Sequence, residues 1–519
     1  MSTSFSSDDS NSSESTQNHA LSLREFLDEA VFVGAEDISV TQCVDRAEKC
    51  RPGDVFIPRH NANVDEHDRV EEAIRRGAVA VVCDRILPVS VPQCLVDDTQ
   101  EVFARVCQRL YGDPSKRMLT IGVVGTSGKS STALFVSSML KKLGGAVGYY
   151  TSLGSSDSTA CDRTTTKPPG AKRLAEWMQR VDQSGAPAAV IELTPAMLRQ
   201  NVTAGVEFDL IILTGMRGSQ LRGGAGVRHF GKLLDKLASS VKSHGMLLYN
   251  ADDAQASNWV ERADIPAISY GLDASEHVRA KRLSRDGGQQ QLLVMAGNIL
   301  MPLTIKIPGD HMARAALAAV ATAWMFDFNV PDSISGVELL TNIPGRMQRV
   351  SQSVEVPVFI DSGYTPDRIA TALHGLRQHH FGPATVVVDL HPGLDAKWRQ
   401  RLGEVLEKSA HKVVLTGSDL AVKATQTAAM DVLGGCEAPG RVQVIPDRSA
   451  AIRWAVDNTS KGVVLLSGCG EKEWADREGD IVSDEMLAKL AVTHKNDAST
   501  PNLAVFPPPE SNTVFPIDS

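Results

Sequence analysis

Apolar, β-branched runs alternate along the chain with longer stretches in which apolar residues recur at helical spacing. The pattern predicts strands at 118–126, 188–193, 208–215, 246–250, 358–361, 384–390, 412–417, 442–446 and 462–468. Helices are predicted over 130–143, which ends at Gly144-Gly145, and over the alanine-rich stretch 311–324. Because continuous apolar strands separated by helices are typical of parallel sheets covered on both faces, we expect an α/β fold.

Chain length and turn-rich stretches predict three domains between two polar tails. The 519 residues correspond to about three domains of roughly 150 residues each. The sequence GDPSK precedes the strand at 118–126, and the strand pattern restarts near 356 after Pro344-Gly345. Residues 1–20 have too few large apolar residues to form a core, and residues 495–519 carry three consecutive prolines and little periodicity, so we expect both ends to be disordered. The expected division is a tail over 1–20, an N-terminal domain over 21–115, a central domain over 116–343, a C-terminal domain over 344–494 and a tail over 495–519.

Composition narrows the class of protein. The net charge is −9 and no run of lysine and arginine stands out, which argues against a nucleic-acid-binding face. The eight cysteines form no CxxC pair, so we expect reduced thiols rather than a zinc site. No signal peptide and no apolar run long enough to span a membrane is visible. We therefore expect a cytoplasmic protein with no membrane span, and we expect a monomer.

A phosphate-binding loop is predicted in the stretch GVVGTSGKSSTALF, residues 122–135. Glycines let backbone N–H groups point at a phosphate, and the N-terminus of the following helix adds partial positive charge. A lysine reaches the terminal phosphates of a triphosphate, and a hydroxyl holds Mg²⁺. The residues predicted to bind ATP are Gly125, Thr126, Ser127, Gly128, Lys129, Ser130 and Ser131. Val123 departs from the strict pattern, which has glycine there.

The loop GTSGKSS resembles the GTNGKT/S loop of the Mur ligase family, and most closely its UDP-N-acetylmuramoyl-tripeptide synthetase (MurE) type. Other segments resemble that family in the same order, across residues 38–493: RPGDVF, GAVAVV, FDLIILTG, YNADD, PGRMQ, DSGYTPD, DRSAAI and GCGE. The resemblance implies three α/β domains: a UDP-sugar-binding-like domain, a central P-loop ATPase sheet and a C-terminal Rossmann-like domain. It also implies an ATP- and Mg²⁺-dependent ligase that joins a UDP-muramoyl-peptide to an amino acid through an acyl phosphate, in peptidoglycan precursor synthesis.

The same resemblance implies roles for particular residues. Glu192 falls where the family has a Mg²⁺-binding glutamate. The active-site lysine of the family falls within HFGKLLDKL, where Lys232 is the first candidate and Lys236 the second. The remaining implied contacts are Arg346 and Asp361 to the nucleotide, and Arg46 and Thr165 to the UDP-sugar substrate.

Several family motifs are altered in this chain. Ala196 replaces a histidine, Gly215, Ser219, Gln220 and Arg222 replace polar residues near the metal, and Met312 and Ala315 replace two asparagines on the adenine side. The DNPR motif that grips diaminopimelate is absent near 415–420. Two hypotheses therefore follow. The first is an amide ligase with a rebuilt amino-acid pocket, and the second is a regulatory paralogue that binds nucleotide or a partner without turnover. A third hypothesis is a ligase like folylpolyglutamate or cyanophycin synthetases, but RPGDVF and GAVAVV favour the muramoyl type.

Overall fold

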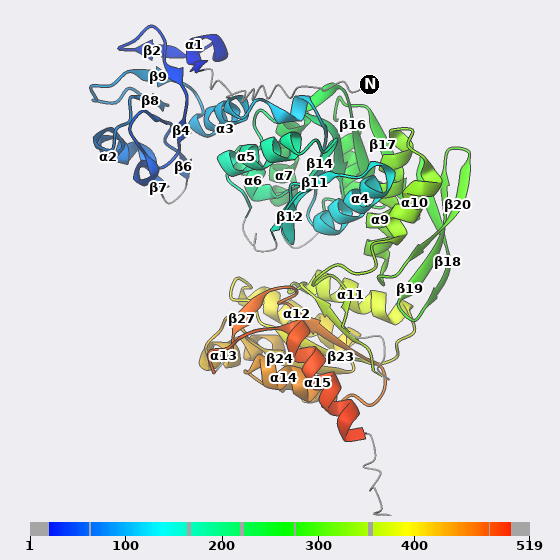
Figure 1. Ribbon diagram of the computed structural model, residues 1–519. Helices are drawn as coiled ribbons and strands as arrows, with labels where there is room; N and C mark the ends of the chain where they lie inside the picture. The colour runs from blue at the N-terminus through cyan, green and yellow to red at the C-terminus, as the bar shows by residue number, and fades with distance from the viewer. Residues whose placement is uncertain are drawn as a thin grey trace, which may run out of the picture. The chain divides into compact units, whose positions relative to one another are not determined.

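A computed structural model describes residues 20–61, 64–162, 168–217, 223–273, 277–350, 356–476 and 478–499. The chain forms two compact units (Figure 1). The first contains most of the chain up to Leu340, and the second contains Thr341 onward together with Ser284–Gln290 and Lys306–Asp310. The predicted tails fall largely outside the described residues, and the last helix ends at Ser499. No helix in the described ranges is long and apolar enough to cross a membrane.

The first unit begins with a small five-stranded sheet. Its strands, in spatial order, are β2 (Val31–Val33), β9 (Gln93–Leu95), β8 (Ala80–Cys83), β5 (Val55–Phe56) and β4 (Cys43–Val44). β4, β5, β8 and β9 run parallel, and β2 is antiparallel. The short flanking elements are β1 (Leu21–Ser22), α1 (Leu23–Phe26), β3 (Ser39–Val40), η1 (Ala47–Lys49), β6 (His60–Asn61), β7 (Val64–Asp65), η2 (Glu66–Arg69) and α2 (Val70–Arg75). Helix α3 (Thr99–Leu110), capped by the Asp98 carboxylate, leads out of this sheet.

An eleven-stranded sheet follows in the chain. Its spatial order is β13 (Cys161–Asp162), β12 (Gly154–Ser156), β11 (Val147–Thr151), β14 (Ala188–Leu193), β10 (Leu119–Val124), β15 (Phe208–Leu213), β16 (Val241–Asn250), β17 (Ala267–Gly271), β18 (Val278–Asp286), β19 (Gln289–Ala296) and β20 (Ile299–Ile305). The helical elements are η3 (Pro114–Lys116), α4 (Lys129–Gly144), α5 (Ala171–Gln183), α6 (Pro195–Arg199), α7 (Gly223–Ala238), α8 (Ala254–Val260), α9 (Asp310–Met325) and α10 (Val330–Glu338). The strands from β11 through β14, β10, β15, β16 and β17 to β18 pair in parallel.

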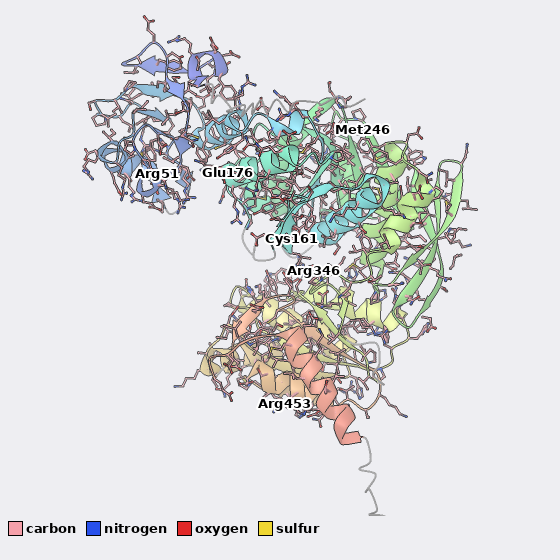
Figure 2. The ribbon with its side chains drawn as sticks, in the orientation of Figure 1. Arg51, Cys161, Glu176, Met246, Arg346 and Arg453 are labelled. Atoms are coloured by element: carbon pink, nitrogen blue, oxygen red, sulfur yellow. The ribbon has the colours of Figure 1, made fainter. Side chains whose placement is uncertain are left out.

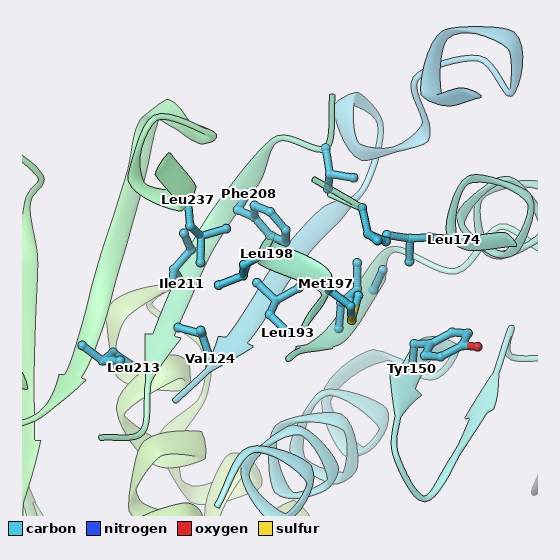
Figure 3. Close-up of a cluster of buried hydrophobic side chains, with 14 of the residues drawn as sticks. Val124, Tyr150, Leu174, Leu193, Met197, Leu198, Phe208, Ile211, Leu213 and Leu237 are labelled. Atoms are coloured by element: carbon cyan, nitrogen blue, oxygen red, sulfur yellow. The ribbon is translucent and has the colours of Figure 1, made fainter. Parts of the chain in front are cut away.

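Successive side chains along each buried strand of this sheet point to opposite faces. On β14, Ile191 and Leu193 belong to one apolar cluster, which also contains Leu174 of α5 and Leu237 of α7 (Figure 3). The side chain between them, Glu192, therefore points to the opposite face, where α4 packs against β14. A buried carboxylate is destabilising unless it has hydrogen-bond or ionic partners.

The second unit is built on a six-stranded sheet. Its order is β21 (Gln348–Arg349), β22 (Val358–Asp361), β26 (Val463–Ser467), β23 (Ala384–Asp389), β24 (Lys412–Thr416) and β25 (Val442–Val444), all parallel except β21. The other elements are α11 (Pro366–Gln378), α12 (Ala396–Ser409), α13 (Val422–Leu433), η4 (Pro439–Arg441), α14 (Arg448–Asp457), β27 (Glu473–Ala475), β28 (Ile481–Ser483) and α15 (Asp484–Ser499). Parallel strands joined by helices make this a Rossmann-like sheet.

The predicted α/β class is confirmed, as is each of the nine predicted strands and both predicted helices. The structure adds strands that the apolar pattern did not predict, including β11–β13 and β17–β20. On β18 and β19 the side chains alternate between buried and exposed. Such half-buried strands lack the continuous apolar runs on which the prediction relied.

His379 gives the second unit a predicted pH dependence. Its ring is buried and its Nε2 atom accepts a hydrogen bond from the Gly309 N–H at 3.4 Å. Burial, assisted by the Arg285 charge, lowers the pKa of His379 from 6.5 to about 4. The folded state therefore favours the neutral ring, so this contribution is complete above pH 6.5 and is lost as the pH falls from 6.5 towards 4. The loss should reach roughly 2–3 kcal/mol.

Urea unfolding between pH 7.5 and pH 4.5 measures this effect. The free energy of unfolding of His379→Phe should fall less steeply with acid than that of the unsubstituted protein. His374→Gln, an exposed position on α11, the helix that His379 follows, should keep the original slope. Equal slopes for all three proteins would show that His379 does not titrate in this way.

Candidate active site

The phosphate-binding loop connects β10 to α4 in a conformation that requires glycine. Gly125 has φ +144° and Gly128 has φ +78°, values that side chains rarely adopt. A Cβ atom at Gly125 would also collide with the Thr214 hydroxyl. Gly128 immediately precedes α4, so the loop places backbone N–H groups at the N-terminus of a sixteen-residue helix. This is the arrangement that binds phosphate.

Glu192 supplies a buried carboxylate at the start of the same helix. Its Oε2 atom accepts hydrogen bonds from the Ser130 hydroxyl at 2.7 Å and from the Ser152 N–H at 2.9 Å. The hydroxyls of Ser130 and Ser152 lie 2.9 Å apart. The Lys129 ammonium lies 3.9 Å from Oε1, and the two side chains are only 9% and 6% exposed. The structure thus brings together Lys129, Ser130 and Glu192, to which the sequence motifs assigned separate roles.

This group of side chains fits Mg²⁺ bound together with a nucleotide phosphate. Its oxygen atoms belong to one carboxylate and two hydroxyls, which are the hard donors that Mg²⁺ prefers. Mg²⁺ usually completes its coordination with waters and substrate phosphates, so two or three protein oxygens are sufficient. Ser130 and Glu192 would hold the ion, and Lys129 with the loop N–H groups would hold the phosphates. Ser131 is also buried on the first turn of α4.

The loop after β15 is fixed against the phosphate-binding loop by residues to which the sequence motifs gave no role. The Asp253 Oδ2 atom accepts hydrogen bonds from the N–H groups of Met216 at 2.8 Å and Arg217 at 3.0 Å. The Asn250 amide donates to the Thr214 carbonyl at 3.0 Å. These contacts hold residues 214–217 in place although the family motif there is altered. The segment YNADD, already noted for its resemblance, contains both Asn250 and Asp253.

Two further contacts join the loops directly. The Thr214 hydroxyl donates to the Ser127 carbonyl at 2.7 Å, and the Thr126 N–H donates to the Gly215 carbonyl at 3.1 Å. Gly215 has φ +152°, and a Cβ atom there would lie 2.8 Å from the Asp253 carboxylate. The glycine found in place of the family's asparagine therefore has a local structural role. Ser219, Gln220 and Arg222, the other altered positions of this motif, lie outside the described residues.

Neither candidate lysine of α7 forms a hydrogen bond or an ion pair with Glu192. Lys236 donates a 2.7 Å hydrogen bond to Glu101 of α3, in an ion pair whose side chains are 49% and 35% exposed. Lys232 is exposed on α7 and forms no hydrogen bond or ion pair with the described residues. The assignment of a catalytic lysine to Lys232 stays a prediction, and the structure gives Lys236 a structural partner.

The predicted substrate contacts near the N-terminal sheet are placed only in part. Arg46 follows β4 and forms an ion pair with Glu48 at 3.2 Å. Thr165 lies outside the described residues. In the same domain as Arg46, the His67 ring is fully buried and its Nδ1 atom lies 2.6 Å from the Asp65 carboxylate. Burial opposes ionisation of Asp65, but hydrogen bonds from Arg85 and His67 hold its pKa well below its usual range.

Asp361, the last residue of β22, contacts the turn that carries Arg346 (Arg346 is labelled in Figure 2). The Arg346 guanidinium donates to the Glu471 carboxylate at 2.9 Å. The buried Asp361 carboxylate accepts hydrogen bonds from the N–H groups of Met347 at 3.0 Å and Gly363 at 2.8 Å. Asp361 therefore organises the backbone around Arg346, in addition to any contact with a ligand.

The carboxyl ends of β22, β23, β24 and β26 carry the side chains that replace the family's amino-acid motif. Tyr364 stacks on the His391 ring, with centroids 4.2 Å apart and planes 17° apart. Burial, followed by the Lys472 charge, lowers the pKa of His391. Asp389 accepts hydrogen bonds from the Ser418 N–H at 2.7 Å and from its hydroxyl at 3.1 Å. The carboxyl edge of this sheet therefore carries the stacked rings of Tyr364 and His391 together with Lys472, and the sequence has no DNPR motif to supply an arginine.

Gly345 fixes the turn that carries Arg346, which gives a prediction. Its φ is +62°, and a Cβ atom would lie 2.5 Å from the Glu471 backbone nitrogen. Gly345→Ala should lower the free energy of unfolding of the second unit by about 2 kcal/mol because of backbone strain and this overlap. Gly440→Ala is the matched control, since no atom lies within 4 Å of the position that its methyl carbon would occupy. Hydrogen exchange of the amides in β22 checks both, and equal protection in the two variants would contradict the prediction.

Comparison with known proteins identifies the family. Residues 123–323 match the Mur ligase middle domain, and residues 345–470 match the Mur ligase glutamate ligase domain. The two matches together cover more than half of the chain. The chain belongs to the Mur ligase family. The family resemblance noted from the sequence is thus confirmed, and it places the phosphate-binding loop and Glu192 in the middle domain and Arg346 and Asp361 in the glutamate ligase domain.

Relatives of this Mur ligase are similar over almost their whole length. The UDP-N-acetylmuramoyl-L-alanyl-D-glutamate–2,6-diaminopimelate ligase of Geobacillus thermodenitrificans is 25% identical over 454 residues, which cover 86% of this chain and 93% of that protein. The enzyme of the same name from Listeria monocytogenes serotype 4b is 24% identical over 478 residues, covering 90% and 97%. Both names are of the MurE type.

Solved structures agree on the fold. A structure of a UDP-N-acetylmuramoyl-L-alanyl-D-glutamate–2,6-diaminopimelate ligase superposes with a TM-score of 0.67 at 18% identity, covering 92% of this chain and 99% of that one. The MurF ligase of Thermotoga maritima in complex with ADP gives a TM-score of 0.60 at 17% identity, covering 88% and 98%. The three-domain Mur ligase architecture expected from the sequence is therefore confirmed.

Proposed function

We propose that this Mur ligase uses ATP to join an amino acid to a UDP-N-acetylmuramoyl-peptide, in the synthesis of peptidoglycan precursors. The observation that carries the proposal is the buried Glu192 carboxylate, held by Ser130 and Ser152 and lying 3.9 Å from Lys129 under a glycine-dependent phosphate-binding loop. The names of the relatives, both of the MurE type, support this substrate class. In this proposal residues 21–115 bind the UDP-sugar, 116–343 bind ATP and 344–494 bind the amino acid.

The proposed reaction proceeds in two steps. The terminal phosphoryl group of ATP is transferred to the carboxylate of the UDP-muramoyl-peptide, which gives an acyl phosphate and ADP. The amine of the incoming amino acid then attacks the acyl carbon, and phosphate leaves. Both partners of the first step are anions, so positive charge must screen them. Lys129, the loop N–H groups and the helix N-terminus supply that charge, and Mg²⁺ held by Ser130 and Glu192 would add Lewis-acid screening.

The second unit contributes nucleotide and amino-acid contacts in this proposal. Arg346 contacts nucleotide phosphate and Asp361 contacts the ribose, as the family resemblance implies. Because the side chains at the carboxyl edge are Tyr364, His391 and Lys472, the amino acid need not be diaminopimelate. The product mass will identify it.

A turnover assay tests the proposal. The purified chain is incubated with ATP, Mg²⁺, UDP-N-acetylmuramoyl-dipeptide and a pool of amino acids, and the nucleotide-sugar masses are read. We expect a mass gain that matches one amino acid. In Glu192→Gln the rate should fall at least about 100-fold, because the charge that positions the metal is lost. Glu207→Gln, a half-exposed residue immediately before β15 of the same sheet, should keep full activity.

The assay also separates the ligase from the regulatory paralogue. A regulatory paralogue would bind ATP in a Lys129-dependent manner and give no mass gain with any amino acid. That outcome would overturn the ligase proposal for this substrate and favour the alternative.

A further inference from the structure

Two buried thiols face each other in the first unit, away from the phosphate-binding loop. The Sγ atoms of Cys43 on β4 and Cys107 on α3 lie 3.8 Å apart. Both residues are 1% exposed. They belong to the same apolar cluster, in which α3 covers the N-terminal sheet. A disulfide has an S–S distance of about 2.05 Å, so side-chain rotation over less than about 2 Å would bring the sulfurs to bonding distance.

In the described part of the chain, no other two thiols lie within hydrogen-bonding distance of each other. All eight cysteines are free, and six of them are buried. The sulfurs of Cys50 and Cys436 contact backbone carbonyls, and that of Cys83 contacts the Gln93 amide. Cys469 contacts the Ser418 hydroxyl. Among the described residues, Cys43 and Cys107 are therefore the two cysteines placed to react with each other.

Both cysteines line a cavity of about 210 Å³. Gln42, Lys172 and Tyr111 line the same cavity. Its polar wall and volume suit a small polar molecule, since a water occupies about 30 Å³. A peroxide of two oxygen atoms, about the size of two waters, fits this space. Buried thiols without such a cavity would be shielded from oxidants.

We propose that hydrogen peroxide converts Cys43 and Cys107 into an intramolecular disulfide. The thiolate of one cysteine attacks an oxygen of hydrogen peroxide, the O–O bond breaks, and a sulfenic acid and a first water form. The second thiol attacks the sulfenic sulfur, the S–S bond forms, and a second water leaves. Two thiols are oxidised to one disulfide, and one peroxide is reduced to two waters.

The surroundings of Cys43 and Cys107 determine the rate of disulfide formation and the elements that the disulfide would join. Burial, reinforced by the neighbouring Cys43, raises the pKa of the Cys107 thiol well above its usual value, so little thiolate is present and the reaction is slow. The disulfide would join residues 64 positions apart. It would fasten β4 to α3, the helix that also contacts the central domain through Lys236 and Glu101 at 2.7 Å. Next to α3, Tyr111 donates to Glu176 of α5 at 2.8 Å (Glu176 is labelled in Figure 2).

The full chain treated with hydrogen peroxide tests this proposal. Remaining thiols are alkylated, and the protein is digested without reductant. We expect a peptide that links Cys43 to Cys107, an intact mass lower by two hydrogens, and a thermal midpoint raised by roughly 5 °C. A dithiol reductant should reverse all three changes.

Matched variants make the test specific. Cys107→Ser should abolish the linked peptide and the thermal shift, whereas Cys94→Ser, a buried cysteine of the same sheet, should leave both. The proposal is overturned if the exposed Cys161 is oxidised while no Cys43–Cys107 peptide forms, or if the link forms only in urea. If Cys107→Ser does not fold, the peptide map of the unsubstituted protein decides the question alone.

Discussion

Lys129→Ala should lower kcat/KM for ATP-dependent ligation about 1,000-fold while leaving the chain folded. Removing one preorganised group that stabilises transition-state charge typically costs two to three orders of magnitude, and Lys129 is the one lysine on the first turn of α4. Its ammonium is 9% exposed and lies 3.9 Å from Glu192. At a buried position, a fixed positive charge next to a developing negative charge acts more strongly than it would in solvent.

The fold should tolerate this substitution because Glu192 keeps its other partners. Its carboxylate still accepts hydrogen bonds from the Ser130 hydroxyl and the Ser152 N–H. Lys142→Ala, an exposed lysine near the end of the same helix, serves as the control and should be fully active. ATP-induced thermal stabilisation should vanish in Lys129→Ala and persist in Lys142→Ala. Full activity in Lys129→Ala would remove the phosphate-binding loop from the proposed mechanism.

The sequence predicted those candidate site residues that lie within one short motif, but not the partners that strand pairing brings to them. The phosphate-binding loop was predicted from one continuous stretch of sequence, and Glu192 was a candidate because it falls where the resembling family has a glutamate, at the end of an apolar strand. Ser152 could not be found in this way, because it reaches Glu192 only when β11 pairs with β14. Asp253 was also missed, because its contacts with Met216 and Arg217 depend on the pairing of β15 with β16. Such partners depend on sheet order, which a single sequence does not determine.

A single sequence also did not determine the role of the candidate lysines of α7, and it did not predict every strand. The pattern HFGKLLDKL predicts an amphipathic helix, but it does not determine which face meets the site, and Lys236 is paired with Glu101. Strands β18–β20 were missed because one side of each is exposed, and β11–β13 because they are short and not wholly apolar. Continuous apolar strands are the part of an α/β fold that a sequence predicts best.

The second large effect is expected in the core of the second unit, at the ion pair of Arg448 and Asp484. Both side chains are 0% exposed. The guanidinium donates from Nε to Oδ1 at 2.7 Å and from Nη2 to Oδ2 at 2.6 Å, a bidentate pairing. It also lies 5.6 Å from the centre of the Trp474 ring. The two residues join the start of α14 to the start of α15.

Arg448→Ala should lower the free energy of unfolding of the second unit by roughly 3–5 kcal/mol, because it leaves the Asp484 carboxylate buried without its partner. Arg453→Ala, on the exposed side of the same helix (Figure 2), should change stability by less than about 0.5 kcal/mol. Urea dependence of hydrogen exchange in β26 reports on this unit within the full chain. Unchanged protection in Arg448→Ala would show that the pair contributes nothing to stability.

A double variant distinguishes a charge effect from a packing effect. If the cost of Arg448→Ala is mainly an unpaired buried charge, replacing both partners by apolar side chains should recover most of the stability, because neither desolvation cost then remains. Arg448→Met with Asp484→Leu should therefore be more stable than either single variant. Asp389, whose Oδ1 atom lies 3.8 Å from the Arg448 Nη1 atom, would lose its only neighbouring guanidinium among the described residues, yet it keeps two hydrogen bonds from Ser418. A double variant as unstable as Arg448→Ala would instead show that the guanidinium is needed for Asp389, and so for the carboxyl edge of the sheet where the amino acid is proposed to bind.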